Sequence, residues 1–143
     1  MKEETLKTNS RFPLSIRFIM SIVSSFIVVI AIYYISVGID FIDPTLQLPG
    51  FSFQPFALIP VLAISLIGIS LAALVFMILK AYVKTKWKRA YLILAAVVLL
   101  AAFIATLLIP EASVGMIIAL NLMHIAVAIC TVYFLVYFNQ YRP

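Results

Sequence analysis

The sequence predicts an all-α membrane protein, a four-helix transmembrane bundle of up-down-up-down topology with both termini in the cytoplasm. Three observations support this prediction. Of the 143 residues, 66% are hydrophobic and 10% are charged, whereas soluble domains average about 25% charged residues. The apolar residues form four uncharged runs of about 20 residues, the length that crosses a hydrocarbon core about 30 Å thick. All 10 basic residues lie on one side of these runs.

The runs define a single transmembrane domain, residues 1–143, with spans at about residues 17–39, 56–79, 90–109 and 113–138. They are apolar on every side, which favours helices over the alternating strands of a membrane barrel. Pro13 precedes the first run, where proline can start a helix. Pro110 and Glu111 separate the last two runs by so few residues that their helices are expected to be antiparallel neighbours.

The connections carry opposite charge. The outer loop, residues 40–55, contains Asp40 and Asp43 but no basic residue, and its two proline turns leave two conformations open. It either lies flat in the headgroup region or folds back over the bundle. The inner loop, residues 80–89, is the most basic stretch, and by the positive-inside rule it faces the cytoplasm. Its basic residues set the topology or bind anionic lipid: Lys80, Lys84, Lys86, Lys88 and Arg89.

The net charge of +5 therefore reflects membrane topology and not nucleic-acid binding. The expected partners are the lipid bilayer, and a homo-oligomer or another membrane protein, with no nucleic acid. The expected location of the chain is the plasma membrane.

His124 is the only histidine, roughly 16 Å beyond Ser113 along the fourth run, and Asn121 shares its helix face. The same spacing predicts one stripe of polar and small residues: Ser113, Ile117, Asn121, His124, Ala128, Thr131 and Leu135. Two interpretations remain open. The imidazole and the amide hydrogen-bond to a neighbouring helix and fix its register. Alternatively, they form a functional site, either proton-responsive or a ligand for haem, metal or quinone.

Small residues recur at helical spacing in three of the runs. They are Ser21 and Ser25, then Ser65, Gly68 and Ala72, then Ala95, Ala102 and Ala105. Small side chains allow the backbones of membrane helices to approach closely. We expect these residues to pack inside one bundle, with an oligomer interface as the alternative.

The sequence does not indicate an enzyme. Asp40, Asp43 and Glu111 share the outer side, but Asp43 is typical of a turn and Glu111 of a helix N-terminus. No buried Asp, Glu, Lys or Arg is expected within a span, and one histidine cannot complete a metal site. Cys130 is the single cysteine, so it forms no internal disulfide and is expected to fill apolar space. We predict no catalytic residue, no metal and no cofactor.

The segment Asn121-Leu122-Met123-His124-Ile125-Ala126-Val127-Ala128 resembles the last helix of a family of small bacterial four-helix membrane proteins of unknown function. The resemblance covers roughly residues 17–138. It implies that His124 is a family feature and that the membrane is a prokaryotic plasma membrane, and it assigns no activity. Claudin-like proteins share the order of long and short loops, but this chain lacks their outer-loop cysteine pair and tryptophan motif.

Three functions remain open. The favoured one is a non-enzymatic helper or interaction subunit in the membrane. The second is a small oligomeric transporter or channel, in which His124 and Asn121 face a wet cavity. The third is a haem- or quinone-binding protein that uses His124.

Overall fold

The computed structural model describes residues 12–46, 52–83 and 85–138, and within these ranges it contains helices and no strand. The elements are α1 (Leu14–Gly38), α2 (Leu58–Tyr82), α3 (Trp87–Leu107), α4 (Val114–Val132) and the π-helix η1 (Tyr133–Tyr137). The four segments α1, α2, α3 and α4 with η1 are each long and apolar enough to cross a membrane. The predicted all-α, four-helix architecture is therefore confirmed.

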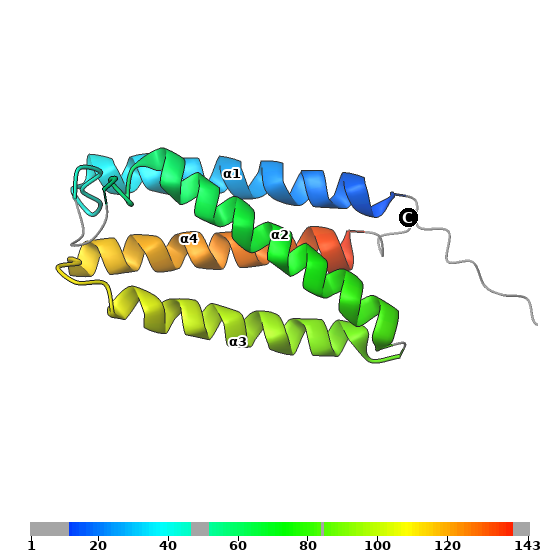
Figure 1. Cartoon of the computed structure of the whole chain (residues 1–143). Coiled ribbons are helices and arrows are strands. Elements are labelled where there is room, and N and C mark those ends of the chain that lie inside the picture. Colours follow the sequence, from blue (N-terminus) through cyan, green and yellow to red (C-terminus); the bar gives the residue numbers. More distant parts are fainter. Residues whose placement is uncertain (1–11, 47–51, 84, 139–143) are drawn as a thin grey trace, which may run out of the picture.

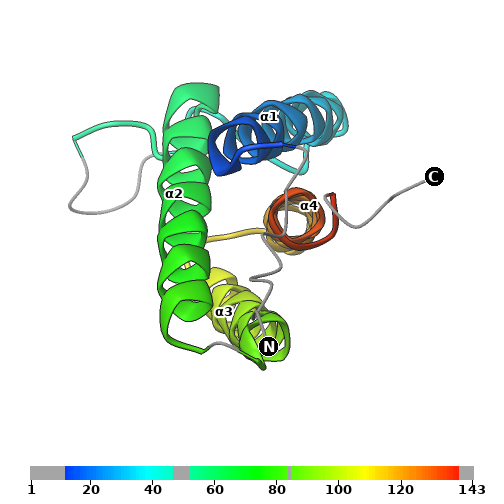
Figure 2. The same cartoon turned by 90° about the vertical axis from the view of Figure 1, so that its right-hand side faces the viewer.

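The helices alternate in direction and form two layers (Figure 1). Helix α4 lies between α1 and α3, and α2 crosses this layer obliquely, from the end of α1 to the start of α3 (Figures 1 and 2). The start of α1 and the end of η1 lie close together. The rings of Phe12 and Phe138, which flank them, have centroids 5.3 Å apart. We call the end that carries the α2–α3 connection the basic end, and the opposite end the acidic end.

Local interactions set the helix ends at the acidic end. Helix α1 ends in a Schellman motif, in which the N–H of Phe41 donates to the carbonyl of Ser36 at 2.8 Å. The N–H of Asp40 donates to Val37 at 3.2 Å, and Asp40 has a φ of 57°, a position where glycine is preferred. Ser113 caps α4, since its hydroxyl accepts the N–H of Met116 at 3.1 Å.

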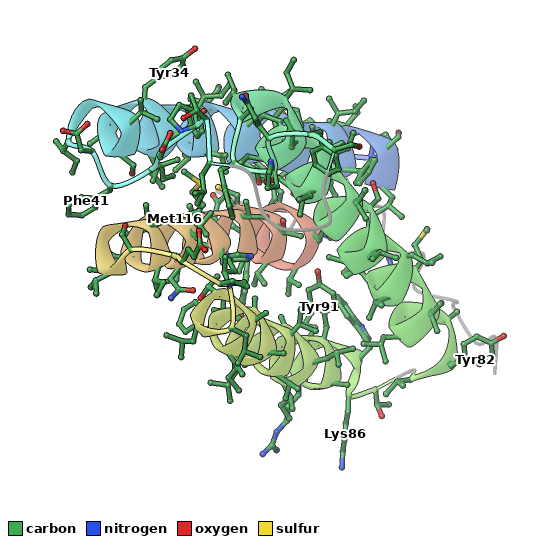
Figure 3. All side chains as sticks on the ribbon, turned by 60° about the vertical axis from the view of Figure 1, so that its left-hand side comes forward. Tyr34, Phe41, Tyr82, Lys86, Tyr91 and Met116 are labelled. Carbon is green, nitrogen blue, oxygen red and sulfur yellow. The ribbon has the colours of Figure 1, made fainter. Side chains whose placement is uncertain are left out.

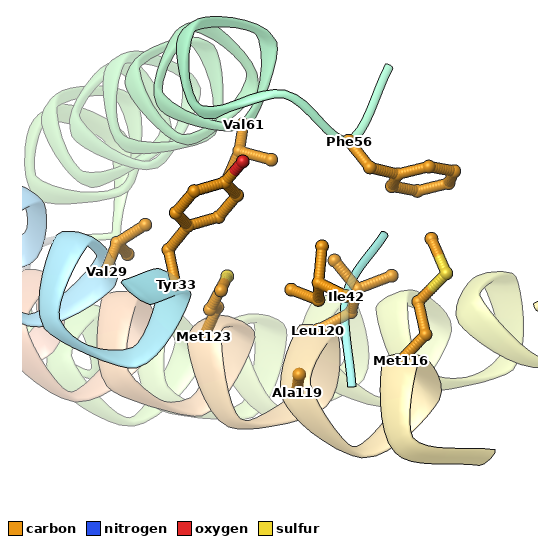
Figure 4. Close-up of a cluster of buried hydrophobic side chains, with 9 residues drawn as sticks. All are labelled: Val29, Tyr33, Ile42, Phe56, Val61, Met116, Ala119, Leu120 and Met123. Carbon is orange, nitrogen blue, oxygen red and sulfur yellow. The ribbon is translucent and has the colours of Figure 1, made fainter. Parts of the chain in front are cut away.

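An apolar cluster fills the bundle at the acidic end (Figure 4). Its buried members are Val29, Tyr33, Ile42, Phe56, Val61, Met116, Ala119, Leu120 and Met123. Ile42 and Phe56 come from the connection between α1 and α2, so the described flanks of this connection fold back over the bundle. For these flanks, the structure has the second of the two conformations that the sequence left open, and residues 47–51 of the loop lie outside the described residues.

A second apolar cluster lies at the basic end. It joins Ala73 and Phe76 of α2, Tyr91 of α3, and Leu135 and Val136 at the end of the chain's last helix. Phe76 is its centre, with T-shaped ring contacts to Trp87 at 5.2 Å and to Tyr91 at 5.5 Å. This cluster joins α2 and α3 to η1.

Small residues join α1 to α4 between the two clusters. Ser21 and Ser25 are fully buried, and the hydroxyl of Ser21 donates to Oγ1 of Thr131 at 3.3 Å. The expected packing of this pair inside the bundle is confirmed. The same expectation is wrong for Gly68, which is exposed and would meet no atom within 4 Å if it carried a Cβ.

Candidate functional site

Asn121 links α4 to α3. Oγ1 of Thr106 lies 2.9 Å from Oδ1 of Asn121 and 2.8 Å from the carbonyl of Phe103. A hydroxyl carries one proton, so the threonine donates to one of these acceptors at a time. Thr106 is buried and Asn121 half-buried, and an apolar side chain at either position would leave the other without this partner. The pair therefore fixes the register of α3 against α4, as the first interpretation of Asn121 expects.

The contribution of this pair is measurable by a double-mutant cycle. We expect Asn121→Leu and Thr106→Val to be non-additive, with a coupling energy of about 0.6 kcal/mol, the average for hydrogen bonds between membrane helices, and at most about 1.7 kcal/mol. The measurement is reversible unfolding in mixed micelles of all four variants. Additive losses of unfolding free energy would show that the hydrogen bond does not link the helices energetically.

Among the described residues, His124 has no hydrogen bond to a neighbouring helix. Its Nδ1 lies 2.7 Å from the carbonyl of Leu120, one turn earlier in α4. A carbonyl can only accept, so Nδ1 carries a proton and donates. In the neutral ring, Nε2 is then an acceptor, and it has no hydrogen-bond partner among the described residues. A half-buried imidazole with a free lone pair could hold a single metal or haem ligand position, or the hydroxyl of a ligand.

An open apolar cleft of about 380 Å³ separates α3 from the end of α4 and η1, beginning one turn beyond His124. Nine residues line it: Leu92, Ala95, Ala96, Leu99, Ala128, Ile129, Val132, Tyr133 and Tyr137. The cleft exists because α3 is held mainly at its two ends. Its buried residues are Tyr91, which joins the cluster at the basic end, and Thr106, which meets Asn121. The middle of α3 presents small side chains that leave the space between the helices unfilled.

The predicted stripe along α4 does not act as one surface. Asn121 contacts α3, and Ala128 lines the α3–α4 cleft, whereas Thr131 is buried against Ser21 of α1. Leu135 is buried in the cluster at the basic end. Because α4 lies between two helices, residues at similar spacing meet different neighbours (Figure 2).

Arg17 corrects the expectation that no charged residue is buried within a span. Helix α1 begins at Leu14 and places Arg17 inside it, with 5% of its surface exposed. Its Nε donates to the carbonyl of Phe134 at 3.0 Å, and its guanidinium carbon lies 5.5 Å from the centre of the Phe76 ring. Arg17, Ser21, Ser25, Val29 and Tyr33 all lie on the buried face of α1. Extending this four-residue spacing back from the serines would have revealed the arginine.

The basic residues predicted for the inner loop are split by the helix ends. Lys80 lies in α2, and Lys88 and Arg89 lie in α3, while Lys84 lies outside the described residues. The described members of this set are exposed, and Lys86 points away from the bundle (Figure 3). The Lys88 ammonium lies 5.6 Å from the centre of the Trp87 ring. These residues remain accessible to headgroups or to another protein.

The acidic residues occupy turns. Asp43 accepts hydrogen bonds from the Thr45 hydroxyl at 2.6 Å and the Thr45 N–H at 2.8 Å. These bonds, the hydroxyl first, hold the pKa of Asp43 below its usual value. Glu111 has a φ of 62° in the turn that Ala112 closes by donating to Ile109 at 3.4 Å, just before the Ser113 cap. Within the described ranges, no three histidine, cysteine, aspartate or glutamate side chains gather as metal ligands.

This fold and this set of buried polar residues define a class: an all-α, multi-pass membrane protein with four candidate membrane-spanning helices. The chain belongs to the family of unknown function DUF6069, whose model matches residues 13–140. The resemblance found in the sequence to a family without an assigned activity is thereby confirmed. No curated protein and no solved structure matches the chain significantly.

Proposed function

We propose that this protein is a non-enzymatic interaction subunit of the plasma membrane of a prokaryote, and that it binds a transmembrane helix of another membrane protein. The observation that supports this function best is the cleft between α3 and α4. It is apolar, it lies within two candidate spans, and Ala95, Ala96 and Ala128 line it.

Helix association in lipid depends on close packing, because lipid chains are as apolar as the helix surfaces. Where large side chains form a convex surface, replacing lipid by another helix lowers the free energy only slightly. Alanine side chains in a concave cleft allow another backbone to approach closely, so this part of the surface favours a helix over lipid. We orient the bundle with its basic end in the cytoplasm, as the positive-inside rule requires.

The described interior favours this proposal over a transport path through one bundle. Apolar clusters fill the space at both the acidic and the basic end. Between them, the polar contacts are isolated pairs, such as Ser21 with Thr131 and Thr106 with Asn121. Ion- and proton-coupled transporters usually place a connected series of ionisable groups along their path.

The test is a substitution whose larger side chain fills the cleft. Ala95→Leu is expected to release a stoichiometric membrane partner from the protein extracted in mild detergent, as measured by native mass spectrometry. Ala101→Leu is the matched control, because Ala101 is an exposed alanine of the same helix outside the cleft. A co-purifying chain supports the proposal only if the first variant loses it and the second retains it. A single chain without a partner, or a partner that Ala95→Leu does not release, would contradict the proposal.

One observation favours a second function, the binding of a haem or quinone by His124. Nε2 of His124 is free among the described residues, and the apolar cleft begins at Ala128, one turn along the same face. This function predicts a visible absorption band in the purified protein, or a co-extracted quinone, that His124→Ala removes. The same variant would leave a helix partner in the cleft bound.

A further inference from the structure

We propose that Arg17 and the aromatic side chains around it form a binding site for a phosphate group, which a membrane phospholipid supplies at the basic end of the bundle. This site is separate from the α3–α4 cleft. It lies among α1, α2 and η1, because Arg17 contacts Phe76 and Phe134. The inference does not depend on the proposed function.

Arg17 has more hydrogen-bond donors than partners in the described structure. A guanidinium carries five N–H donors and is always charged in proteins. In the described part of the chain only Nε has a hydrogen-bond partner, the carbonyl of Phe134. The residue is only 5% exposed, but its terminal nitrogens are not among the fully buried atoms that lack a partner, so the remaining donors reach the small exposed part of the side chain. Within the described ranges no carboxylate pairs with this charge, and a largely buried guanidinium without a counter-ion favours an anionic ligand at its free donors.

The chemistry of the guanidinium indicates which ligand it can bind. A planar guanidinium presents two parallel N–H groups that match two oxygens of a phosphate or a carboxylate. The guanidinium carbon lies 5.5 Å from the centre of the Phe76 ring, and this cation–π contact uses none of the N–H donors. Tyr91, which also contacts Phe76, is buried and points from α3 into the bundle (Figure 3). Its hydroxyl has no partner among the described residues and is a further neutral donor at this end of the bundle.

The position of Arg17 near the start of α1 indicates that the site lies among lipid headgroups. Arg17 lies one turn into α1, about 5 Å along the helix from its start, which is the depth of lipid headgroups and not of the bilayer centre. Lys80, Lys86 and Arg89 are exposed at the same end. Such residues raise the local concentration of anionic lipid. A phospholipid phosphate is therefore the phosphate that this site meets at the highest concentration.

The test is titration of the full-length protein with phosphatidylglycerol in mild detergent at 1 M ammonium acetate, with native mass spectrometry to count bound lipids. The Debye length at this salt concentration is about 3 Å, so attraction by exposed basic residues is screened. We expect one saturable lipid on the unmodified protein. Arg17→Gln should weaken its binding by about tenfold or more, because a charge-assisted bidentate contact is lost. Arg89→Gln, which removes an exposed charge, should leave the affinity within about twofold.

A competition arm separates the two sources of phosphate. If inorganic phosphate at millimolar concentration displaces the lipid, the site recognises the free ion as well. If it does not, the lipid itself is the ligand. The absence of a saturable lipid on the unmodified protein would overturn the proposal, whatever the variants do. Equal binding by Arg17→Gln and the unmodified protein would also overturn it, and would indicate that Arg17 only holds Phe134.

Discussion

Phe76→Ala is expected to lower the free energy of unfolding by about 3–5 kcal/mol, the largest effect of any substitution considered for this chain. Phe76 is 1% exposed. Its ring contacts Trp87, Tyr91 and Arg17, which belong to two other helices. Removing the ring leaves a cavity and separates α2 from α3 at the basic end, where Tyr91 provides one of the few buried contacts of α3. Reversible unfolding in mixed micelles measures the loss.

The matched control is Met77→Ala. Met77 follows Phe76 directly in α2, but its side chain is 45% exposed. Lipid or detergent can replace the lost methylene and methyl groups there, so we expect a change below about 1 kcal/mol. Similar losses in the two variants would mean that burial in the described structure does not determine stability. Phe76→Leu should lie between them, because it keeps apolar volume but loses the ring contacts.

Gly115→Ala is expected to destabilise the protein by about 1–3 kcal/mol, the usual cost of overpacking. A Cβ at this position would lie 2.7 Å from Cδ1 and 2.8 Å from Cγ of Phe41, and 3.2 Å from its Cα. The ring could turn aside, but the backbone of Phe41 is held by the Schellman motif at the end of α1. The methyl group would therefore push the connection between α1 and α2 away from α4.

Gly68→Ala provides a matched control, because the same change in α2 meets no atom within 4 Å. It should be neutral, or stabilising by up to about 1 kcal/mol, because alanine favours helix more than glycine does. The double variant Gly115→Ala with Phe41→Ala should be more stable than the sum of the two single losses predicts. Strict additivity would mean that the close approach of Phe41 to Gly115 does not cause the loss.

The four helices could be predicted because a span requires about 20 apolar residues, whatever its neighbours are. Which face of each helix is buried could not. In water, apolar residues mark the buried face, but lipid-facing and protein-facing residues are both apolar in a membrane. Gly68 illustrates the difficulty. Its spacing from Ala72 is the same as that of Ser21 from Ser25, yet Gly68 is exposed and both serines are buried.

The candidate site was predicted only in part, for related reasons. Asn121 could be predicted to pair with another helix, because a buried amide needs a partner. Its partner Thr106 could not, because hydroxyls of threonine can bond to their own helix. Arg17 could not be recognised as buried because the predicted first span begins at residue 17, which places the arginine at its end, whereas α1 begins at Leu14. The α2 crossing and the η1 helix, which bring Phe76 and Phe134 to this arginine, leave no signal in the hydropathy pattern.

We propose that the four helices span a membrane with the basic end in the cytoplasm. Single cysteines at Gln54 and Lys86, introduced in a Cys130→Ser background, test it through labelling of intact cells with an impermeant maleimide. Both positions are exposed, at the acidic and the basic end respectively. We predict that the cysteine at 54 is labelled from outside and that the one at 86 is labelled only after the cells are permeabilised. Labelling of both positions from the same side would contradict the four-span bundle.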